Sequence, residues 1–582
     1  MEMVNIKING MPLSVPGGIS ILEAARYAGI DIPTLCYMKE INEIGACRIC
    51  MVEVKGARTL VSACVFPVNE GMEIFTNSER VRNSRKITLE LILSTHNRSC
   101  LSCVRSGNCE LQSLCLEYGV ERPDRYDGAK PVYAIDNSMP HMVRDNNKCV
   151  LCRRCVAACA NQAVSVIGAN ARGFDTHISS AFELDLDSYS CIACGQCIVN
   201  CPTGALYEKD DTDKVLAAIN DPDKFVVVQT APAVRAALGE EFGYEIGTDV
   251  EGKMVAALRR LGFDKVFDTN FSADLTIMEE SHELVERVKN GGVLPMITSC
   301  SPGWIKYCEH YYPDELDHLS TCKSPQQMFG ATIKTWYAQN MGIDPADIVS
   351  VSVMPCTAKK FEVGRDDQDA AGFADVDISI TTRELARMIS GAGINFNLLP
   401  DEQYDNPLGE GTGAAVIFGA TGGVMEAALR TAVKTLTGED PADPEFTEVR
   451  GMDGVKEATY SVGGLDIKVC IASGTKNAKT VMDKVASGEC DYTFIEIMGC
   501  PGGCINGGGQ PIQPASVRNF VDVKSLRASV LYKSDAAKEV RFSHENSAVK
   551  RVYDEFFGEP GSHKAHEVLH TSYVKRGLYN EQ

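Results

Sequence analysis

Two runs of cysteines with the same spacing constrain the fold of this chain more than any other feature. The first reads C-V-L-C-R-R-C-V-A-A-C and the second reads C-I-A-C-G-Q-C-I-V-N-C-P. The spacing C-x2-C-x2-C-x3-C is a ligand pattern for 4Fe-4S clusters, and in a pair of such runs the fourth cysteine of each ligates the other cluster. Structural zinc is the alternative. We expect one cluster on Cys149, Cys152, Cys155 and Cys201, and the other on Cys191, Cys194, Cys197 and Cys159.

Four more cysteines lie near the amino terminus, in a segment with mixed strand and helix signals. Residues 3–8 alternate in polarity and turn at Asn9-Gly10, which predicts a hairpin, and residues 20–29 have a helical period. A loop with three thiolates and a distant fourth is typical of a 2Fe-2S cluster on a small β-grasp domain, although the first gap is wider than in the plant-type spacing. Structural zinc is again the alternative. The expected ligands are Cys36, Cys47, Cys50 and Cys64.

A third group follows a predicted helix over residues 77–93. Here a histidine stands four positions before the first of three closely spaced cysteines. A lone histidine would be structural, but this spacing indicates an iron–sulfur or zinc site with one imidazole and three thiolates. The expected ligands are His96, Cys100, Cys103 and Cys109, and Cys115 is expected to be a buried thiol.

The size and composition of the chain indicate several packed domains. Its 582 residues exceed what one hydrophobic core usually holds, and 44% of them are hydrophobic. The 24 cysteines cluster in ligand-type runs, unlike those of a secreted disulfide scaffold. We find no leader peptide and no apolar run long enough to cross a bilayer, and the net charge of -21 argues against nucleic acid as a partner. We therefore expect a cytoplasmic, oxygen-sensitive protein of anaerobic metabolism.

From Asp221 onward the pattern changes to alternating strands and helices. The segment K-V-F-D-T at 265–269 predicts a strand, and the charged helix-like segments from Ala528 onward predict a surface extension that covers the site. The alternation predicts an α/β domain with two parallel sheets that flank a cleft. Further buried strands are predicted at 225–229, 293–298, 348–354, 414–419 and 469–472.

The segment I-E-I-M-G-C-P-G-G-C-I-N-G-G-G at 495–509 carries two cysteines among glycines. The three residues between Cys500 and Cys504 place two sulfurs within reach of one metal centre, and the glycines let the backbone approach it. Two cysteines cannot complete a four-ligand site, so we expect further donors from Cys300 and Cys356. The alternative is that each is a small buried hydrophobe.

Three segments together resemble the signatures of [FeFe]-hydrogenases. They read T-S-C-S-P-G-W, M-P-C-T-A-K-K-F-E and E-I-M-G-C-P-G-G-C-I-N-G-G-G, in the family's order. The resemblance extends over the whole chain, because the amino-terminal cluster modules look like those of the clostridial enzymes and of the peripheral cluster-bearing subunit of respiratory complex I. It implies an H-cluster, which is a 4Fe-4S cube joined through one thiolate to a two-iron unit with carbon monoxide, cyanide and azadithiolate ligands.

By resemblance, Cys504 bridges the cube and the two-iron unit, and Cys356 and Cys500 complete the cube with a residue of the first motif. That motif departs from the family's two adjacent cysteines, because Ser301 follows Cys300. Taken strictly, the resemblance makes Cys300 the proton relay and Ser301 an unusual oxygen ligand. Thiolate is the better cluster ligand. We therefore favour Cys300 as the ligand and Ser301 as the relay, and the choice between them stays open.

The resemblance also implies a file of proton-carrying groups behind the first motif. Glu280 and Glu283 lie on one face if their segment is helical. By resemblance, Glu280, Ser320 and Glu283 continue the path to solvent. Glu279 and His282 are expected to be solvated neighbours.

Other residues are expected to surround the two-iron unit. Lys359 is placed to donate to an anionic cyanide ligand, with a solvated lysine as the alternative. Cys308, Cys322, Cys470 and Cys490 lack partner spacing and are expected to be structural. The remaining contacts are expected from Pro232, Met354, Met498, Gln326 and Phe418.

These inferences combine into reversible H2 formation from protons and electrons, with electrons relayed by one 2Fe-2S and three accessory 4Fe-4S clusters. We expect the hydrogenase subunit of an electron-bifurcating complex that uses ferredoxin and NAD(P)H through flavin-binding and iron–sulfur partner subunits, because the chain has no G-x-G-x-x-G of its own. The alternatives are a stand-alone ferredoxin-dependent hydrogenase and a non-catalytic hydrogen sensor or cluster-assembly homologue. The expected domains are a β-grasp 2Fe-2S domain at 1–79, a one-histidine 4Fe-4S domain at 80–138, a two-cluster ferredoxin-like domain at 139–210 and an H-cluster domain at 211–582.

Overall fold

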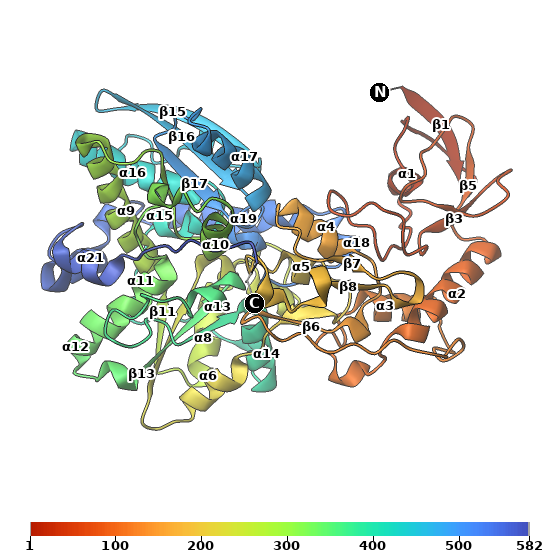
Figure 1. Ribbon diagram of the computed structural model, residues 1–582, viewed down its shortest axis with the longest axis horizontal. Helices are drawn as coiled ribbons and strands as arrows, with labels where there is room; N and C mark the ends of the chain where they lie inside the picture. Colours follow the sequence, from red (N-terminus) through yellow and green to blue (C-terminus); the bar gives the residue numbers. More distant parts are fainter. Residues whose placement is uncertain (1, 580–582) are drawn as a thin grey trace. The chain divides into compact units, whose positions relative to one another are not determined.

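The computed structural model describes residues 2–579 and divides the chain into two compact units (Figure 1). Unit 1 consists of Met1–Ser188, Asn200–Tyr207 and Ile512–Val521. Unit 2 consists of Tyr189–Val199, Glu208–Pro511 and Asp522–Gln582. The first long cysteine run therefore belongs to unit 1, whereas the first three cysteines of the second run belong to unit 2.

Unit 1 begins with a five-stranded mixed sheet. The hairpin predicted at Asn9-Gly10 is confirmed, since both residues have positive φ and β1 pairs antiparallel with β2. Ser20 caps the predicted helix α1 (Ile21–Tyr27) in a capping box with Glu23. Apolar side chains of the helix and sheet form one core. The strand order is β2 (Met11–Pro16), β1 (Met3–Ile8), β5 (Glu73–Phe75), β3 (Met51–Val54), β4 (Val61–Ser62).

The rest of unit 1 is helical with short strands, and one buried arginine ties its cysteine segments together. Arg154 is fully buried and donates to both carboxylate oxygens of Glu110, at 2.8 and 3.0 Å. It also donates to the carbonyls of Cys36 (3.4 Å) and Tyr37 (3.2 Å). The predicted helix at 77–93 is confirmed as α2. The elements are α2 (Glu79–Thr95), α3 (Glu110–Glu117), α4 (Arg154–Asn161), β6 (Met142–Arg144), β7 (Gly168–Asn170) and β8 (His177–Ser179).

Unit 2 contains two four-stranded sheets (Figure 1). The first is wholly parallel, as predicted, in the order β11 (Lys265–Asp268), β10 (Phe225–Thr230), β13 (Ile348–Met354), β14 (Ile378–Thr381). The second has the order β12 (Met296–Ile297), β17 (Phe494–Met498), β16 (Leu465–Ser473), β15 (Val455–Val462). The prediction of a parallel second sheet is wrong at its edge, because β15 and β16 form an antiparallel hairpin across Gly463-Gly464.

Helices cover both sheets of unit 2. One apolar cluster joins the first sheet to α8 (Glu251–Leu261) and α14 (Thr382–Gly391), and a second joins it to α11 (Pro325–Thr332), α20 (Ser547–Val552) and α21 (His563–Leu569). A third cluster packs the second sheet against helices near its face. The other helices include α7 (Pro232–Arg235), α9 (Asn270–Asn290), α10 (Pro302–Tyr311), α16 (Gly423–Thr437), α17 (Thr475–Ala486) and α19 (Val523–Ala537).

Two expectations for unit 2 are wrong. Residues 414–419 form a short helix, α15 (Gly413–Val416), followed by a 3-10 turn, because a fully buried apolar run has no periodicity that separates strand from helix. The segment after Ala528 is not a surface extension: Val549, Val552 and Leu569 are buried in the core.

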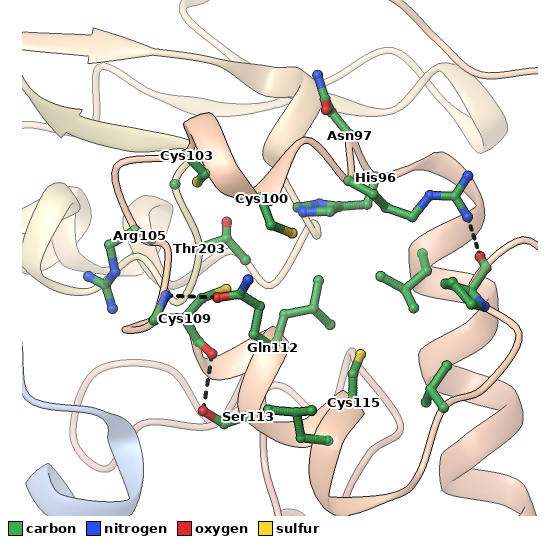
Figure 2. Close-up of a pocket in the computed structure, with 18 residues that line it drawn as sticks. His96, Asn97, Cys100, Cys103, Arg105, Cys109, Gln112, Ser113, Cys115 and Thr203 are labelled. Atoms are coloured by element: carbon green, nitrogen blue, oxygen red, sulfur yellow. Dashed lines mark hydrogen bonds between the residues drawn. The ribbon is translucent and has the colours of Figure 1, made fainter.

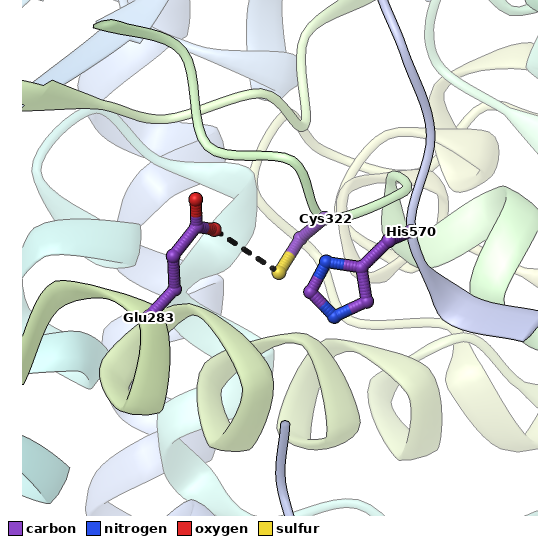
Figure 3. A group of neighbouring side chains, drawn as sticks. All are labelled: Glu283, Cys322 and His570. Carbon is purple, nitrogen blue, oxygen red and sulfur yellow. Dashed lines mark hydrogen bonds between the residues drawn. The ribbon is translucent and has the colours of Figure 1, made fainter. Parts of the chain in front are cut away.

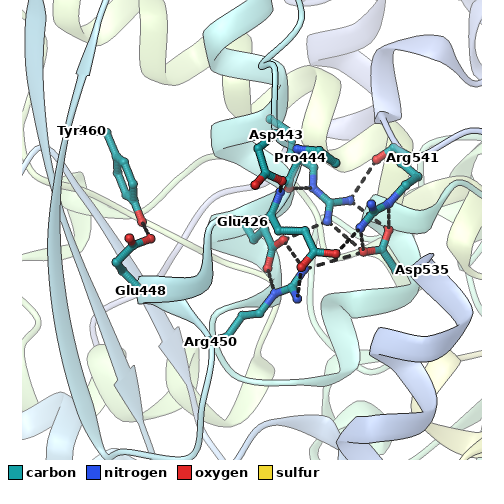
Figure 4. A network of polar contacts seen from close by, with 10 residues as sticks. Glu426, Asp443, Pro444, Glu448, Arg450, Tyr460, Asp535 and Arg541 are labelled. Atoms are coloured by element: carbon teal, nitrogen blue, oxygen red, sulfur yellow. Dashed lines mark hydrogen bonds and ion pairs between the residues drawn. The ribbon is translucent and has the colours of Figure 1, made fainter.

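A network of arginines and acids connects α16 to the end of α19 (Figure 4). Arg430 donates to Glu426 at 2.8 Å and to Asp535 at 2.9 and 3.0 Å. Arg450 donates to Glu426, and Arg541 donates to Asp535. Arg430, Glu426 and Asp535 are fully buried, so these charges are compensated inside the protein.

Within residues 2–579, no helix is long and apolar enough to cross a membrane.

Candidate functional site

The strands of unit 2 deliver cysteines to one place. Cys356 follows the last residue of β13 by two positions, Cys500 follows β17 by two and Cys300 follows β12 by three. Ligand sites in α/β sheets form at the carboxyl ends of parallel strands. Cys504 comes from the glycine-rich turn after Cys500, where a single 3-10 turn begins.

Three thiols converge at these strand ends. Cys500 donates a hydrogen bond to Cys356, which lowers the pKa of Cys356 and raises that of Cys500. Burial, followed by the charge of Cys356, raises the pKa of Cys504 to about 12. Soft sulfur donors that lie close together suit an iron–sulfur cluster.

The glycines of the 495–509 segment allow this convergence. Gly503 has φ 95°, and a Cβ there would lie 2.7 Å from the amide nitrogen of Thr421. A Cβ at Gly507 would lie 2.2 Å from the carbonyl oxygen of Pro355, which precedes Cys356. The close backbone approach predicted from the glycines is therefore a steric requirement of this loop.

Ser301 and Cys300 of the first motif have different surroundings. Ser301 Oγ accepts a hydrogen bond of 3.1 Å from the amide of Gly499, next to Cys500. Cys300 is partly buried, and burial of its thiol, followed by the charges of Glu280 and Cys504, raises the pKa of Cys300 well above the usual value.

Lys359 is buried, so the alternative of a solvated lysine is wrong. Its ammonium donates to the carbonyl of Cys300 (3.2 Å), to Ser324 Oγ (2.8 Å) and to Glu362 (2.9 Å). Gln326 donates to the same carboxylate at 2.8 Å. Glu362 was not expected in the site; its signal is its position three residues after Lys359 on α13 (Ala358–Glu362).

The remaining predicted contacts lie in the buried parts of unit 2. Phe418, Met498 and Cys300 share one apolar cluster, and Met354 belongs to the cluster on the first sheet. Pro232 is the first residue of α7 and is buried. Cys308 and Cys470 are fully buried, which agrees with the structural role expected from their spacing.

Two acids of α9, Glu283 and Glu280, differ in their hydrogen-bond partners. Ser320 Oγ donates to Glu283 at 2.9 Å, and Arg287 donates to the same carboxylate at 2.6 Å. Among the described residues no donor reaches either oxygen of Glu280 with hydrogen-bond geometry. Burial, followed by the charge of Glu283, raises the pKa of Glu280 to about 8, and the nearby amide of Ser299 and hydroxyl of Ser320 offset this only in part.

Glu279 is not the solvated neighbour that the sequence predicted. It is fully buried, and it accepts hydrogen bonds from Tyr553 Oη and from the amide of Gly561 at 2.9 Å. Sequence could not show this, because both donors lie at the far end of the chain. His570 Nε2 is 3.2 Å from the same carboxylate.

The second cysteine run packs directly on the glycine-rich loop within unit 2. Thr357 Oγ1 donates to the carbonyl of Ala193 at 2.7 Å, and Gln196 donates to the carbonyl of Asn506 at 2.9 Å. The charge of Cys194 also contributes to the raised pKa of Cys500. The sequence predicted that this run carries clusters of an electron relay, but it gave no sign that the run shares hydrogen bonds with the glycine-rich loop and with Thr357.

The cysteine groups of unit 1 also gather locally. Cys149, Cys152, Cys155 and Cys201 line one pocket. In the amino-terminal group, Cys50 Sγ lies 3.3 Å from Cys64 Sγ, and the amide of Cys47 donates to Cys36 Sγ at 3.4 Å.

The one-histidine group lines a cavity of about 490 Å³ (Figure 2). His96, Cys100, Cys103 and Cys109 face it, and so does Cys115, which is only partly buried. Burial lowers the pKa of His96 to about 4, so its imidazole is neutral at pH 7. Its Nδ1 is buried without a hydrogen-bond partner among the described residues. Neutral imidazole is the metal-binding form.

Five family models match the chain. "Iron only hydrogenase large subunit, C-terminal domain" matches residues 224–508, and "Iron hydrogenase small subunit" matches 521–576. "2Fe-2S iron-sulfur cluster binding domain" matches 1–79, "NADH-ubiquinone oxidoreductase-G iron-sulfur binding region" matches 85–124 and "4Fe-4S dicluster domain" matches 148–205.

Individual relatives agree with these models. The NADP-reducing hydrogenase subunit HndD of Solidesulfovibrio fructosivorans is 49% identical, over 99% of this chain and 100% of its own length. Iron hydrogenase 1 of Clostridium pasteurianum is 44% identical, over 98% and 100%. The structure of the apo [FeFe]-hydrogenase HydA1 from Chlamydomonas reinhardtii matches with a TM-score of 0.57 at 42% identity, covering 64% of this chain and 100% of that one.

Proposed function

The chain belongs to the [FeFe]-hydrogenase family, and from this premise we propose how its residues divide the work of an iron hydrogenase. The enzyme interconverts H2 with protons and electrons, and its iron–sulfur domains relay the electrons. The observation that carries the assignment of the site is the convergence of Cys356, Cys500 and Cys504 beside Glu280.

The donor set fits the H-cluster. Three thiols, of Cys356, Cys500 and Cys504, meet at a loop in which Gly503 and Gly507 have no room for a Cβ, and the buried Lys359 lies beside them. We assign Cys356, Cys500 and Cys504 to the cluster. When bound, the cluster supplies the redox-active iron at which protons and electrons combine to H2. Lys359 is fixed by Ser324 and Glu362 and directs its charge to this pocket.

For the first motif we propose the reverse of the assignment favoured from sequence. Ser301 hydrogen-bonds beside Cys500, so its oxygen lies on the side of the cube ligands. Cys300 is coupled electrostatically to Glu280, so its thiol lies on the proton side. Cys300 then passes a proton to Glu280, and Ser320 and Glu283 continue the route.

The raised pKa of Glu280 suits this task. A carboxyl that titrates near pH 8 can both accept and release a proton at neutral pH, as a relay must. Glu283 is fixed by Arg287 and receives the hydroxyl of Ser320, which orients the next step.

We propose that electrons reach this site through four accessory clusters in three domains, at 1–79, 80–138 and 139–210, and that residues 211–582 form the H-cluster domain. The matched segments at 1–79, 85–124 and 148–205 support these limits. The 2Fe-2S ligands are Cys36, Cys47, Cys50 and Cys64 on a β-grasp sheet, and the buried neutral His96 supports its place in the second group. The contact of the second cysteine run with the catalytic loop supports entry of electrons there.

We further propose that the chain works in the cytoplasm as the hydrogenase subunit of an NADP-linked, bifurcating complex with flavin-binding subunits and ferredoxin. The relative HndD, named as an NADP-reducing hydrogenase subunit, supports the link. Within residues 2–579 the cysteines form no disulfide, which suits a reducing compartment. The chain alone should evolve H2 with reduced viologen but not with NADPH.

The direct test is infrared spectroscopy of the purified chain after insertion of the two-iron unit, combined with an H2 assay. We expect absorption from metal-bound carbon monoxide and cyanide together with H2 evolution. A correctly folded, iron-loaded chain that shows neither would contradict the assignment.

A further inference from the structure

Three side chains with different donor atoms meet beside the outer end of the proposed proton route (Figure 3). They are Glu283 of α9, Cys322 of the loop before α11 and His570, which follows α21. One donor atom of each lies within 4.8 Å of the other two. None of the three was predicted to work with the others, because they are far apart in sequence.

Backbone pairing explains why Cys322 and His570 face each other. They are opposite partners of an isolated antiparallel bridge. The amide of Lys323 donates to the carbonyl of Leu569 at 2.8 Å, and the amide of Thr571 donates to the carbonyl of Thr321 at 2.8 Å. Directly opposite residues of an antiparallel pair project to the same side. The thiol and the imidazole are thus placed together by the fold.

We propose that Glu283, Cys322 and His570 bind a divalent transition-metal ion of the zinc class. One thiolate, one imidazole and one carboxylate are the donors that Zn²⁺ takes in proteins, and three protein ligands leave a fourth position for water. Each donor atom needs to move only slightly, since ligand atoms around tetrahedral zinc are about 3.5 Å apart. The Cys322 thiol gives up its proton on binding.

The surroundings of His570 match a metal ligand. Its Nε2 lies 3.2 Å from Glu279 Oε2, and Glu279 is itself fixed by Tyr553 and Gly561. A carboxylate on the second ring nitrogen orients the ring of a ligating histidine and increases its basicity. Nδ1, 2.7 Å from the rotatable hydroxyl of Thr321, is then free to ligate.

A cation can reach this group from solvent. The Cys322 side chain is fully buried, but the side chains of Glu283 and His570 keep 13% and 7% of their exposure. Within residues 2–579, Arg287 is the only arginine or lysine that forms an ion pair with Glu279 or Glu283, and it binds Oε1 of Glu283. The local charge therefore favours a bound cation.

Occupancy would interrupt proton supply. The hydroxyl of Ser320 and the thiol of Cys322 both approach the same oxygen of Glu283, Oε2, at 2.9 and 3.8 Å. A metal ion at that oxygen removes the acceptor of Ser320. This consequence, unlike the metal site itself, rests on the proposed proton route.

The test is zinc titration of the cluster-loaded enzyme by equilibrium dialysis, with iron content followed throughout and zinc-edge X-ray absorption for ligand identity. We expect one added zinc per chain, with one sulfur among its ligands and no loss of iron. Cys322→Ala and His570→Ala should each weaken binding by at least about 100-fold. The matched controls are Cys470→Ala, another fully buried thiol of unit 2, and His566→Ala, whose ring lies 3.9 Å from that of His570.

The outcomes separate the two parts of the proposal. No stoichiometric zinc, zinc without sulfur, or equal binding by Cys322→Ala and Cys470→Ala overturns the metal site. Viologen-driven H2 evolution should fall as zinc binds, and Cys322→Ala should keep its own zinc-free rate at the same zinc concentration. Zinc bound through sulfur without loss of rate overturns the proton-route consequence and leaves the metal site standing.

Discussion

Buried acids at two places in unit 2 have opposite surroundings, and their pKa values shift in opposite directions. Asp535 and Glu426 are surrounded by arginines (Figure 4), and although burial acts to raise the pKa of Asp535, hydrogen bonds from Arg541 and Arg430 bring it below its usual value. Glu280 is as deeply buried but has no such partner, and its pKa rises to about 8. A buried acid that serves the structure is fully paired. One left unpaired is a candidate for chemistry.

The largest effect should come from the unpaired acid. Glu280→Gln removes the only titrating oxygen at that step of the route, so we expect viologen-driven H2 evolution to fall by about 10³-fold. The infrared bands of the two-iron unit should be unchanged, since the amide has the same shape. A rate within a few-fold of the parent enzyme would show that protons take another path.

The paired acid should give the opposite result. Asp535→Asn leaves Arg430 and Arg541 partly uncompensated, and we expect a loss of about 3 kcal/mol in the free energy of unfolding. The folded variant should keep its specific H2 activity. Glu448→Gln is the matched control, because Glu448 accepts only an exposed hydrogen bond from Tyr460. If Asp535→Asn were no less stable than that control, the network would not be structural.

The first motif allows the comparison to be extended to a thiol. If Cys300 is on the proton side, Cys300→Ala should lower H2 evolution by about 100-fold while the cube keeps its iron and its EPR signal. Ser301→Ala should instead alter that signal. Loss of the cube in Cys300→Ala alone would restore the assignment favoured from sequence.

The smallest effect is on the pH dependence of stability, where the two acids should differ in sign. The folded pKa of Glu280 lies above that of the unfolded chain, so its contribution is full below about pH 4.5 and is lost as pH rises through about 8. The folded pKa of Asp535 is depressed, so its contribution is present above about pH 4 and is lost as pH falls. Between pH 6 and 8 we expect the parent to lose about 2 kcal/mol more than Glu280→Gln, measured by urea unfolding.

Much of the fold followed from local sequence patterns. The hairpin at Asn9-Gly10, the helix after Asn77 and three parallel strands of the first sheet were correctly predicted, because turn residues and apolar periods are local signals, whereas β14 was missed. The buried run at 414–419 was wrongly taken as a strand, since a segment buried on all sides has no polar face to reveal its period.

The site was predictable to the extent that its chemistry sits in short motifs. The three cysteine segments identified which residues could meet, but not on which side Cys300 and Ser301 would lie. The burial of Glu279 and the pairing of Cys322 with His570 depend on a carboxyl-terminal segment almost 300 residues away from α9 in sequence. Contacts of that kind have no local signature.

The hydrogen bonds between the second cysteine run and the glycine-rich loop bear on how such enzymes can be shortened. Gln196 and Ala193 supply partners to Asn506 and Thr357, so a chain trimmed to start after residue 207 would uncover backbone and hydroxyl groups right behind Cys500 and Cys356. A version of this chain without its iron–sulfur domains would therefore need substitutions in the loop that give these groups new partners. A minimal hydrogenase made from this chain would need those repairs before its turnover could be compared fairly with that of the parent.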